Sequence, residues 1–235
     1  MKQIHFESID STNTYLKNNY KNLDNLTFVS ADEQTSGKGR SNRKWISEKG
    51  KNLMFSLLIK DEKLINNFKS LSISSAYTII KVLEEYGLKD LSIKWPNDVY
   101  VKDKKICGIL LESISIEKIE ALIVGIGLNV NQKEFVGEYL IEPTSMYKEL
   151  NKEIDLIKLK NKIYKNLLEN YNKNIYREIL EYDYLKGKQA KAYINNELKD
   201  INIIGINEDY SLKIKVDNIE KDIYAGEISF HLGGN

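Results

Sequence analysis

Residues 91–113 read LSIKWPNDVYVKDKKICGILLES, in which three short apolar runs alternate with two groups of turn-forming residues. The first run predicts a strand at 91–95, which Pro-Asn-Asp ends because proline restricts the preceding residue to an extended conformation. The next two runs, 98–101 and 105–113, predict a hairpin closed by the turn Lys-Asp-Lys at 102–104. We therefore expect this part of the chain to form a sheet.

Elements of both kinds surround this hairpin. Periodic apolar residues and end signals predict helices at about 15–19 after caps at 10–13, at 68–83 before Gly87, and at 156–171 after Asp155. Further strands are expected at 26–31, 52–59 and 121–130. After about residue 184, short strands are expected at 188–194, 198–206, 211–216, 219–225 and 227–231. The pattern indicates a mixed α/β body followed by a small β-barrel.

Composition limits the class of protein. The 235 residues carry a net charge of +1, which argues against a nucleic-acid or membrane-surface function because both depend on a large positive excess. The single cysteine, Cys107, cannot form an intramolecular disulfide, and with only two histidines a His/Cys metal site is not expected. The N-terminus has no secretory segment, and no apolar run reaches the ~20 residues of a membrane helix. We therefore expect a soluble, cytoplasmic protein.

The most unusual local segment is QTSGKGRSNRKW at residues 34–45. Its glycines can turn backbone N–H groups toward an anion, and its four cations can neutralise that anion. One interpretation is therefore a cradle for a phosphate or an acyl phosphate. The alternative is a solvated surface loop, because short basic stretches are common false positives. The segment is not a Walker A loop, and neither it nor the Gly-Ile-Gly at 125–127 completes a dinucleotide-binding fingerprint.

Two polar segments flank the predicted hairpin strands. Asn97 and Asp98 begin a strand with polar side chains, which ordinary turn chemistry also explains. Lys105 opens an apolar strand and can reach inward to a phosphate or carboxylate, although it is equally compatible with a surface lysine at a hairpin. Gly108 leaves room for a ligand or for another backbone. Cys107 is expected to be a small core residue.

Two more segments also have both structural and functional interpretations. The sequence GIGLNVN at 125–131 ends in asparagines whose amides can read a purine edge, or which simply end a strand. The residues Ser-Thr-Asn at 11–13 are helix caps, and a helix N-terminus also presents polar groups to a ligand. Each segment alone is weak evidence of function.

The order of the segments is more specific than any one of them. Ser-Thr-Asn, Gln34 with GKGR and RKW, KWPND, K-x-x-G-I-L-x-E and GIGLNVN follow one another as in biotin–protein ligases, whose catalytic domain the chain resembles from about residue 8 to 131. The tail GEIS at 226–229 is similar to the last strand of that family's SH3-like barrel. The resemblance implies an α+β fold, with a mixed β-sheet flanked by helices at 1–183 and a C-terminal SH3-like β-barrel at 184–235.

The resemblance also implies an activity. The enzyme would be an ATP-dependent ligase that makes biotinyl-5'-AMP from biotin and ATP with Mg²⁺, and releases pyrophosphate. It would then transfer biotin to a lysine of the biotin carboxyl carrier protein domain of a biotin-dependent carboxylase, releasing AMP.

The same resemblance implies the residues of the site. Those expected to bind biotin are Ser11, Thr12, Asn13, Gln34, Lys38, Gly39, Arg40, Lys105 and Gly108. Those expected to bind ATP or the adenylate are Lys38, Arg40, Arg43, Trp45, Asn97, Asp98, Lys105 and Asn129. The expected catalytic residues are Lys105 and Arg40, and no side chain is expected to bind a metal.

Two departures from the family pattern affect these expectations. Lys38 stands where many members have arginine, which keeps the charge but loses the bidentate fork. The Ser-Thr-Asn motif begins at residue 11, which leaves no room before it for the helix-turn-helix domain of some relatives. We therefore expect a stand-alone ligase that does not bind DNA. By analogy with relatives that dimerise through sheet edges, a homodimer is also expected.

Two other functions remain open. A lipoate ligase or octanoyl transferase of the same superfamily would have the same fold, but its Arg-Arg-x-x-Gly-Gly-Gly segment is missing. A ligand sensor or DNA-binding regulator would have no catalytic step, and the net charge of +1 speaks against DNA binding.

Overall fold

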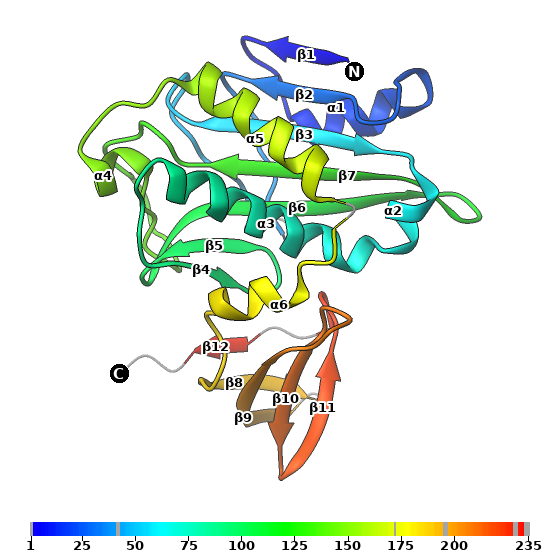
Figure 1. Ribbon diagram of the computed structural model, residues 1–235, viewed down its shortest axis with the longest axis vertical. Helices are drawn as coiled ribbons and strands as arrows, with labels where there is room; N and C mark the ends of the chain where they lie inside the picture. Colours follow the sequence, from blue (N-terminus) through cyan, green and yellow to red (C-terminus); the bar gives the residue numbers. More distant parts are fainter. Residues whose placement is uncertain (1, 41–42, 172, 195–196, 228–229, 233–235) are drawn as a thin grey trace.

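The computed structural model describes residues 2–40, 43–171, 173–194 and 197–227, and the backbone of 230–232. Two sheets make up the fold (Figure 1). The first has the order β1-β2-β3-β7-β6-β5-β4. Its strands are β1 (Gln3–Phe6), β2 (Phe28–Ala31), β3 (Leu53–Ile59), β4 (Leu91–Lys94), β5 (Asp98–Val101), β6 (Lys104–Ser115) and β7 (Ile119–Leu128). Among these described strands only β1 and β2 pair in parallel, so the sheet is mixed.

Helices cover both faces of the first sheet. Three of them are α1 (Thr12–Asn19), α3 (Phe68–Glu85) and α5 (Leu156–Asn170). Side chains alternate along a strand, so neighbouring residues face different helices. Leu58 and Ile123 pack in the cluster that contains Leu16 of α1, whereas Leu57 and Val124 belong to the larger core with α3 and α5. Because both faces are covered, β3 is buried along its whole length and its sequence is nearly all apolar.

The expected end signals are present in the helices. Ser11 caps α1, and its Oγ accepts a hydrogen bond from the backbone N–H of Thr14 at 3.4 Å. Asp155 caps α5 by accepting hydrogen bonds from two backbone N–H groups, both at 3.0 Å. Gly87 follows α3 with φ of +98°, the left-handed conformation that closes many helices. The three predicted helices are therefore confirmed.

The second sheet has the order β11-β10-β9-β8-β12, and all its described strand pairs are antiparallel. Its strands are β8 (Gln189–Ile194), β9 (Glu197–Ile206), β10 (Leu212–Val216), β11 (Ile219–Ile223) and β12 (Phe230–Leu232). Each lies within about three residues of its predicted range. The last prediction, 227–231, includes residues 228–229, which lie outside the described part of the chain.

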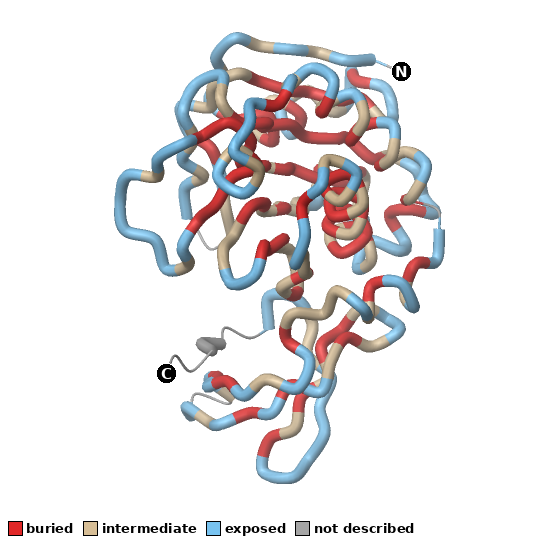
Figure 2. The backbone as a smooth tube through the Cα atoms, turned by 60° about the vertical axis from the view of Figure 1, so that its left-hand side comes forward, coloured by how far each residue is buried: buried red, intermediate tan, exposed pale blue. Residues whose placement is uncertain are grey.

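The two sheets share one apolar core. Trp95, which follows β4, donates its indole N–H at 3.0 Å to the carbonyl of Tyr210, in the turn between β9 and β10. The backbone N–H of Tyr184 bonds to the carbonyl of Ile93 at 3.0 Å. Buried residues follow the strands of the first sheet and the helix sides that face it (Figure 2). The second sheet is thus held against the end of the first sheet that carries β4.

Several short elements were not predicted from the sequence. They are β1, α2 (Glu62–Asn66), α4 (Met146–Leu150), α6 (Tyr176–Ile179) and the 3₁₀ turns Tyr20–Asn22 and Leu180–Tyr182. Each has five residues or fewer, which is too short for apolar periodicity to be visible. None of the described helices combines the length and apolar character needed to cross a lipid bilayer.

Candidate active site

A cavity of about 870 Å³ opens on the α1 face of the first sheet. On β7, Ala121 and Ile123 lie under α1, but the next two residues on that face are Gly125 and Gly127. The glycines leave this end of the face without side chains, so the surface is hollow there. The cavity is lined by every site residue predicted from the sequence: Ser11, Thr12, Asn13, Gln34, Lys38, Gly39, Arg40, Arg43, Trp45, Asn97, Asp98, Lys105, Gly108 and Asn129.

Close contacts explain these glycines. A Cβ on Gly127 would lie 2.4 Å from the Trp45 indole, and one on Gly125 would lie 2.2 Å from Oδ1 of Asn13. A Cβ on Gly108 would lie 3.0 Å from the same indole. Real Cβ atoms do not approach to 2.4 Å, so the glycines are required by what packs on them.

One end of the cavity is formed by the N-terminus of α1. Ser11, Thr12 and Asn13 are all deeply buried, with exposures of 2%, 2% and 4%. The backbone N–H of Thr12 donates to Oε1 of Gln34 at 2.8 Å, and Oγ1 of Thr12 lies 3.0 Å from the same oxygen. This end therefore presents hydroxyl and amide groups without a formal charge.

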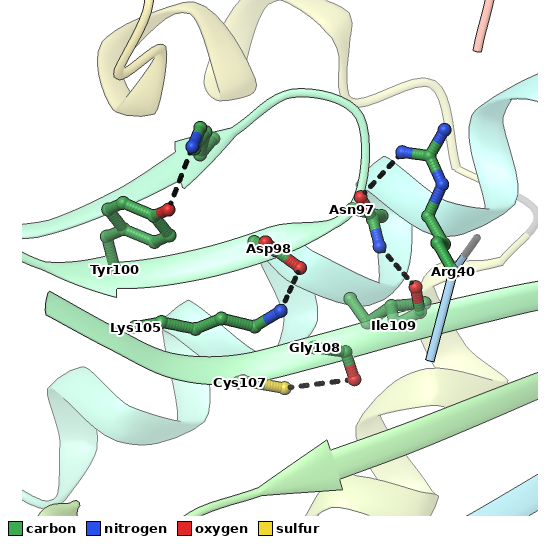
Figure 3. Close-up of polar contacts among 9 residues, drawn as sticks. Arg40, Asn97, Asp98, Tyr100, Lys105, Cys107, Gly108 and Ile109 are labelled. Carbon is green, nitrogen blue, oxygen red and sulfur yellow. Dashed lines mark hydrogen bonds and ion pairs between the residues drawn. The ribbon is translucent and has the colours of Figure 1, made fainter. Parts of the chain in front are cut away.

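The other end of the cavity carries charges. Nζ of Lys105 at the start of β6 lies 2.8 Å from Oδ1 of Asp98 on the paired strand β5 (Figure 3). Their side chains are only 28% and 18% exposed. Nearby, Nζ of Lys94 donates to Oη of Tyr100 at 3.1 Å. Burial lowers the pKa of Lys94, and the positive charge of Lys105 adds to this effect, while Asp98 opposes it. An anion in this part of the cavity would stabilise the charged form of Lys94.

The basic segment folds over the cavity as a tight hairpin. The backbone N–H of Gly39 donates to the carbonyl of Arg43 at 2.7 Å, and that of Trp45 donates to the carbonyl of Gly37 at 2.9 Å. Residues 41–42 lie outside the described residues. The hairpin places its cations beside the cavity. A solvated surface loop without such hydrogen bonds would not fix the positions of these side chains.

Arg40 connects this hairpin to the turn that follows β4. Its Nη1 donates to Oδ1 of Asn97 at 2.9 Å, and Nδ2 of Asn97 donates to the carbonyl of Ile109 at 2.7 Å (Figure 3). Burial lowers the pKa of Arg40, with Asp98 acting in the opposite direction. Arginine nevertheless keeps its charge in proteins, so the cavity retains this cation.

Trp45 and Asn129 lie on the cavity wall in different states of hydrogen bonding. The indole N–H of Trp45 is buried, and no described residue accepts from it. Nζ of Lys105 lies 5.7 Å from the centre of this ring. Asn129 is 4% exposed and donates Nδ2 to the carbonyl of Thr144 at 3.0 Å. That bond fixes the orientation of the amide and leaves its oxygen available to a ligand.

A comparison of the sequence with models of protein families shows which family the chain belongs to. The model that describes the biotin/lipoate A/B protein ligase family matches residues 5–129, more than half of the 235 residues. The chain belongs to the biotin/lipoate A/B protein ligase family. Within that family, the match contains all of the predicted site residues, from Ser11 to Asn129.

Relatives within this family carry similar names. The chain is 35% identical over 132 residues to the bifunctional ligase/repressor BirA of Bacillus subtilis, covering 55% of this chain and 41% of that protein. It is 35% identical over 127 residues to a biotin–[acetyl-CoA-carboxylase] ligase of Paracoccus denitrificans, covering 52% and 51% of the two chains. The matched segment thus spans about half of these curated relatives or less.

A solved structure of a family member matches over nearly the whole chain. The biotin protein ligase from Aquifex aeolicus in complex with biotin and ATP superposes with a TM-score of 0.85 at 31% identity, covering 99% of both chains. The likeness therefore includes the second sheet, which lies outside the family model.

Part of the cavity lining was not predicted from the sequence. Residues 135–143 contribute to its lining, and they are held to β6 by the hydrogen bond from the N–H of Lys105 to the carbonyl of Glu142 at 2.9 Å. Val136 and Leu140 of this segment are 84% and 74% exposed. The segment has no periodicity that could have marked it. Lys94 was visible in KWPND, but only the structure shows that it lines the cavity.

The donor groups of the cavity suit magnesium bound mainly by phosphates. Among the described residues, no three Asp, Glu, His or Cys side chains come together as a metal site. Asp98 is the carboxylate beside the cations, and its Oδ1 is already paired with Lys105. Magnesium commonly takes one or two carboxylates together with substrate phosphates and water. The second oxygen of Asp98 fits that pattern.

Proposed function

We propose that this protein is a biotin–protein ligase, which joins biotin to ATP as biotinyl-5'-AMP and then transfers biotin to a lysine of a carrier protein. One observation carries the proposal: a single cavity has uncharged hydrogen-bonding groups at one end and a lysine–arginine cluster at the other. Biotin has the matching polarity, with a ureido ring at one end and a carboxylate at the other. Two of the proteins named above, the ligase of Paracoccus denitrificans and that of Aquifex aeolicus, carry biotin in their names.

The ureido ring would lie at the N-terminus of α1. A ureido group has two N–H donors and one acceptor oxygen, so its site needs both kinds of partner. The hydroxyl of Ser11 accepts one long contact from Thr14 at 3.4 Å, so its hydrogen is available to the ureido oxygen. Thr12 and Gln34 supply the oxygens for the N–H groups. We propose Asn13, Lys38, Gly39 and Gly108 as the remaining biotin-binding residues.

At the charged end, the carboxylate of biotin would attack the α-phosphorus of ATP, the bond to the β-phosphate would break, and pyrophosphate would leave. Both reactants are anionic, so their approach requires cations. Lys105 is ion-paired with Asp98 and carries three N–H donors, and Arg40 adds a second cation. Donors fixed in a partly dry site stabilise the charge that develops in the transition state. Lys105 and Arg40 are therefore the proposed catalytic residues, with Mg²⁺ neutralising part of the triphosphate charge.

The adenylate would remain enclosed until a carrier arrives. We propose that Lys38, Arg43, Trp45, Asn97 and Asp98 hold its phosphate side, and that the amide oxygen of Asn129 accepts from the adenine amino group. Shielding from water protects a mixed anhydride from hydrolysis. A lysine amine of the biotin carboxyl carrier protein domain of a carboxylase would then attack the acyl carbon and release AMP.

The second sheet and the assembly state belong to the same proposal. We assign residues 1–183 to the catalytic domain and 184–235 to an SH3-like β-barrel, which suits five short antiparallel strands. A cytoplasmic location, a homodimer formed through sheet edges and the lack of DNA binding stay predictions.

The experiment is pyrophosphate release from ATP and Mg²⁺ with biotin, lipoate or octanoate supplied separately. Release with biotin alone supports the proposal, because the cavity end at α1 is polar rather than built for an alkyl chain. Release with lipoate or octanoate alone would make the protein a lipoate-type ligase of the same family. No release with any acid would favour a ligand sensor.

A further inference from the structure

A line of polar side chains runs from the cavity into the sheet. Oγ1 of Thr12 lies 2.6 Å from Oγ of Ser56, a fully buried residue of β3. Oγ of Ser56 lies 2.5 Å from Oδ1 of Asn13, and Nδ2 of Asn13 donates to Oε2 of Glu112 on β6 at 2.6 Å. Together with the 3.0 Å contact from Thr12 to Oε1 of Gln34, this relay connects Gln34 to Glu112.

The relay contains fewer hydrogens than contacts. Three of its contacts join two oxygens: Gln34 to Thr12, Thr12 to Ser56, and Ser56 to Asn13. Only the two hydroxyl groups can supply hydrogens to these contacts, because both amide oxygens are acceptors. One of the three contacts must therefore lack a hydrogen.

Glu112 decides which contact this is. An ionised carboxylate only accepts hydrogen bonds, so the amide of Asn13 must turn its NH₂ toward Glu112 and its oxygen toward Ser56. Ser56 then donates to Asn13 at 2.5 Å, and Thr12 donates to Ser56 at 2.6 Å, because oxygens this close repel without a hydrogen between them. The remaining pair, Oγ1 of Thr12 and Oε1 of Gln34, is the longest of the three at 3.0 Å. Because the hydroxyl of Thr12 has one hydrogen, it cannot donate to both Ser56 and Gln34, and we infer that the contact with Gln34 is the one without a hydrogen.

We propose that Glu112 is a positioning residue that acts through Asn13 and Ser56 to keep Thr12 and Gln34 as a pair of hydrogen-bond acceptors facing the cavity. The proposal rests on biotin as the ligand, because a ureido N–H is the donor that such a pair lacks. The relay also requires a glycine at position 125, because a Cβ there would lie 2.2 Å from Oδ1 of Asn13 and displace its amide.

Changing Glu112 to a donor should reverse the whole relay. In a Glu112→Lys variant the ammonium group must donate to the oxygen of Asn13, whose NH₂ then donates to Ser56. Ser56 would donate to Thr12 and Thr12 to Gln34, so the acceptor pair is lost. We expect the Kd for biotin to rise about tenfold or more, as for a buried donor and acceptor left unmatched. Simple electrostatics predicts the opposite, because the new positive charge attracts the biotin carboxylate.

Two further variants test the direction of the bonds. Ser56→Ala frees the hydrogen of Thr12 to bond to Gln34, and should weaken biotin binding by a similar factor. The double variant Glu112→Gln with Asn13→Asp exchanges the carboxylate and the amide at constant charge. The carboxylate introduced at position 13 can only accept from Ser56, so the double variant should recover most of the biotin affinity that Glu112→Lys loses. In Glu112→Lys and Ser56→Ala the KM for ATP should stay unchanged.

Glu120→Lys is the matched control, because Glu120 accepts from Tyr20 at 2.5 Å and has no described contact with the relay. It should leave the biotin Kd as in the wild type. Biotin Kd is measured by calorimetry on the full chain, after thermal unfolding has shown that each variant is folded. If Glu112→Lys does not fold, the biotin Kd values of Ser56→Ala and of the double variant, each compared with the wild type, test the relay.

The relay is overturned if Glu112→Lys or Ser56→Ala binds biotin as tightly as the wild type, or if the double variant is no better than Glu112→Lys. Failure of the wild type itself to bind biotin would overturn the proposed function together with the relay, so the two failures are distinguishable.

Discussion

At the scale of single residues, the motifs predicted which side chains meet but not how they bond. All of the predicted site residues line one cavity. Asn13, however, turns its amide to Ser56 and Glu112, so its contact with biotin stays a prediction. Ser56 stood in the apolar run NLMFSLLI, and a buried serine there was a signal that pattern reasoning did not use. Hydrogen-bond direction depends on distances that no sequence pattern contains.

Replacing Lys105 by methionine should lower the rate of biotin-dependent pyrophosphate release by about 10²–10³-fold, the usual loss for one well-placed transition-state donor. Methionine keeps the approximate length of the side chain but leaves Asp98 without its ion-pair partner, so thermal unfolding is measured as well, to show that the variant is folded. The measurement is kcat for pyrophosphate release at saturating biotin and ATP. A variant that kept the wild-type rate would exclude Lys105 as a catalytic residue.

Gly127→Ala should weaken biotin binding by about tenfold or more, because the new methyl group overlaps the Trp45 indole and overpacking costs about 1–3 kcal/mol. Trp45 lies on a loop and can move aside, so the overlap should disturb the cavity more than the fold. Calorimetry with biotin and thermal unfolding separate the two effects. Unchanged biotin affinity would show that the indole does not shape the ligand site.

At the scale of elements, predictions succeeded where residues repeat a pattern over several turns or strands. α3 and α5 were predicted because each has a long apolar stripe and an end signal. α2, α4 and β1 were missed because each has only four or five residues. The segment 135–143 was missed for another reason: it borders the cavity as a loop, and its position depends on contacts with β6. Local sequence does not encode such contacts.

The cap of α5 gives a pH-dependent prediction. Hydrogen bonds from backbone N–H groups, above all that of Lys158, hold the pKa of Asp155 below its ordinary value of 3.8. A lowered pKa means that the ionised cap stabilises the fold fully above about pH 4, and that this stabilisation is lost as the pH falls through the folded-state value. Asp155→Asn should therefore melt below the wild type at pH 7 but approach it in acid. Parallel melting curves from pH 7 to pH 2 test this, and a constant difference would contradict it.

At the scale of the whole molecule, composition and motif order were enough to indicate a mixed α/β body followed by a β module. They could not indicate how the two are joined. Trp95, Ile93 and Tyr184 lie at this junction, and their partners are about 90 to 115 residues away in sequence. Contacts of that separation follow from packing, which is why the junction appeared only in the structure.

The bond from Trp95 to the carbonyl of Tyr210 should contribute to the stability of this junction. Trp95→Phe would leave that carbonyl without its partner, at a cost of about 1–3 kcal/mol if it stays dry. Urea unfolding measures the change. Trp45→Phe is the matched control, because the indole N–H of Trp45 has no acceptor among the described residues and its loss should cost less. Equal losses in both variants would show that the bond contributes nothing.

The turn KWPND contacts both the cavity and the turn between β9 and β10. Asn97 and Asp98 line the cavity, and so does Trp95, but the Trp95 side chain is 3% exposed and its indole N–H is bonded to Tyr210, in the turn between β9 and β10. The pentapeptide that indicates the active site therefore also indicates how the two parts of the chain pack against each other. In a relative that lacked the second sheet, an indole at this position would stand in water, and we expect a smaller or polar residue there. The tryptophan in the motif thus informs on architecture, and the two residues that follow the proline inform on catalysis.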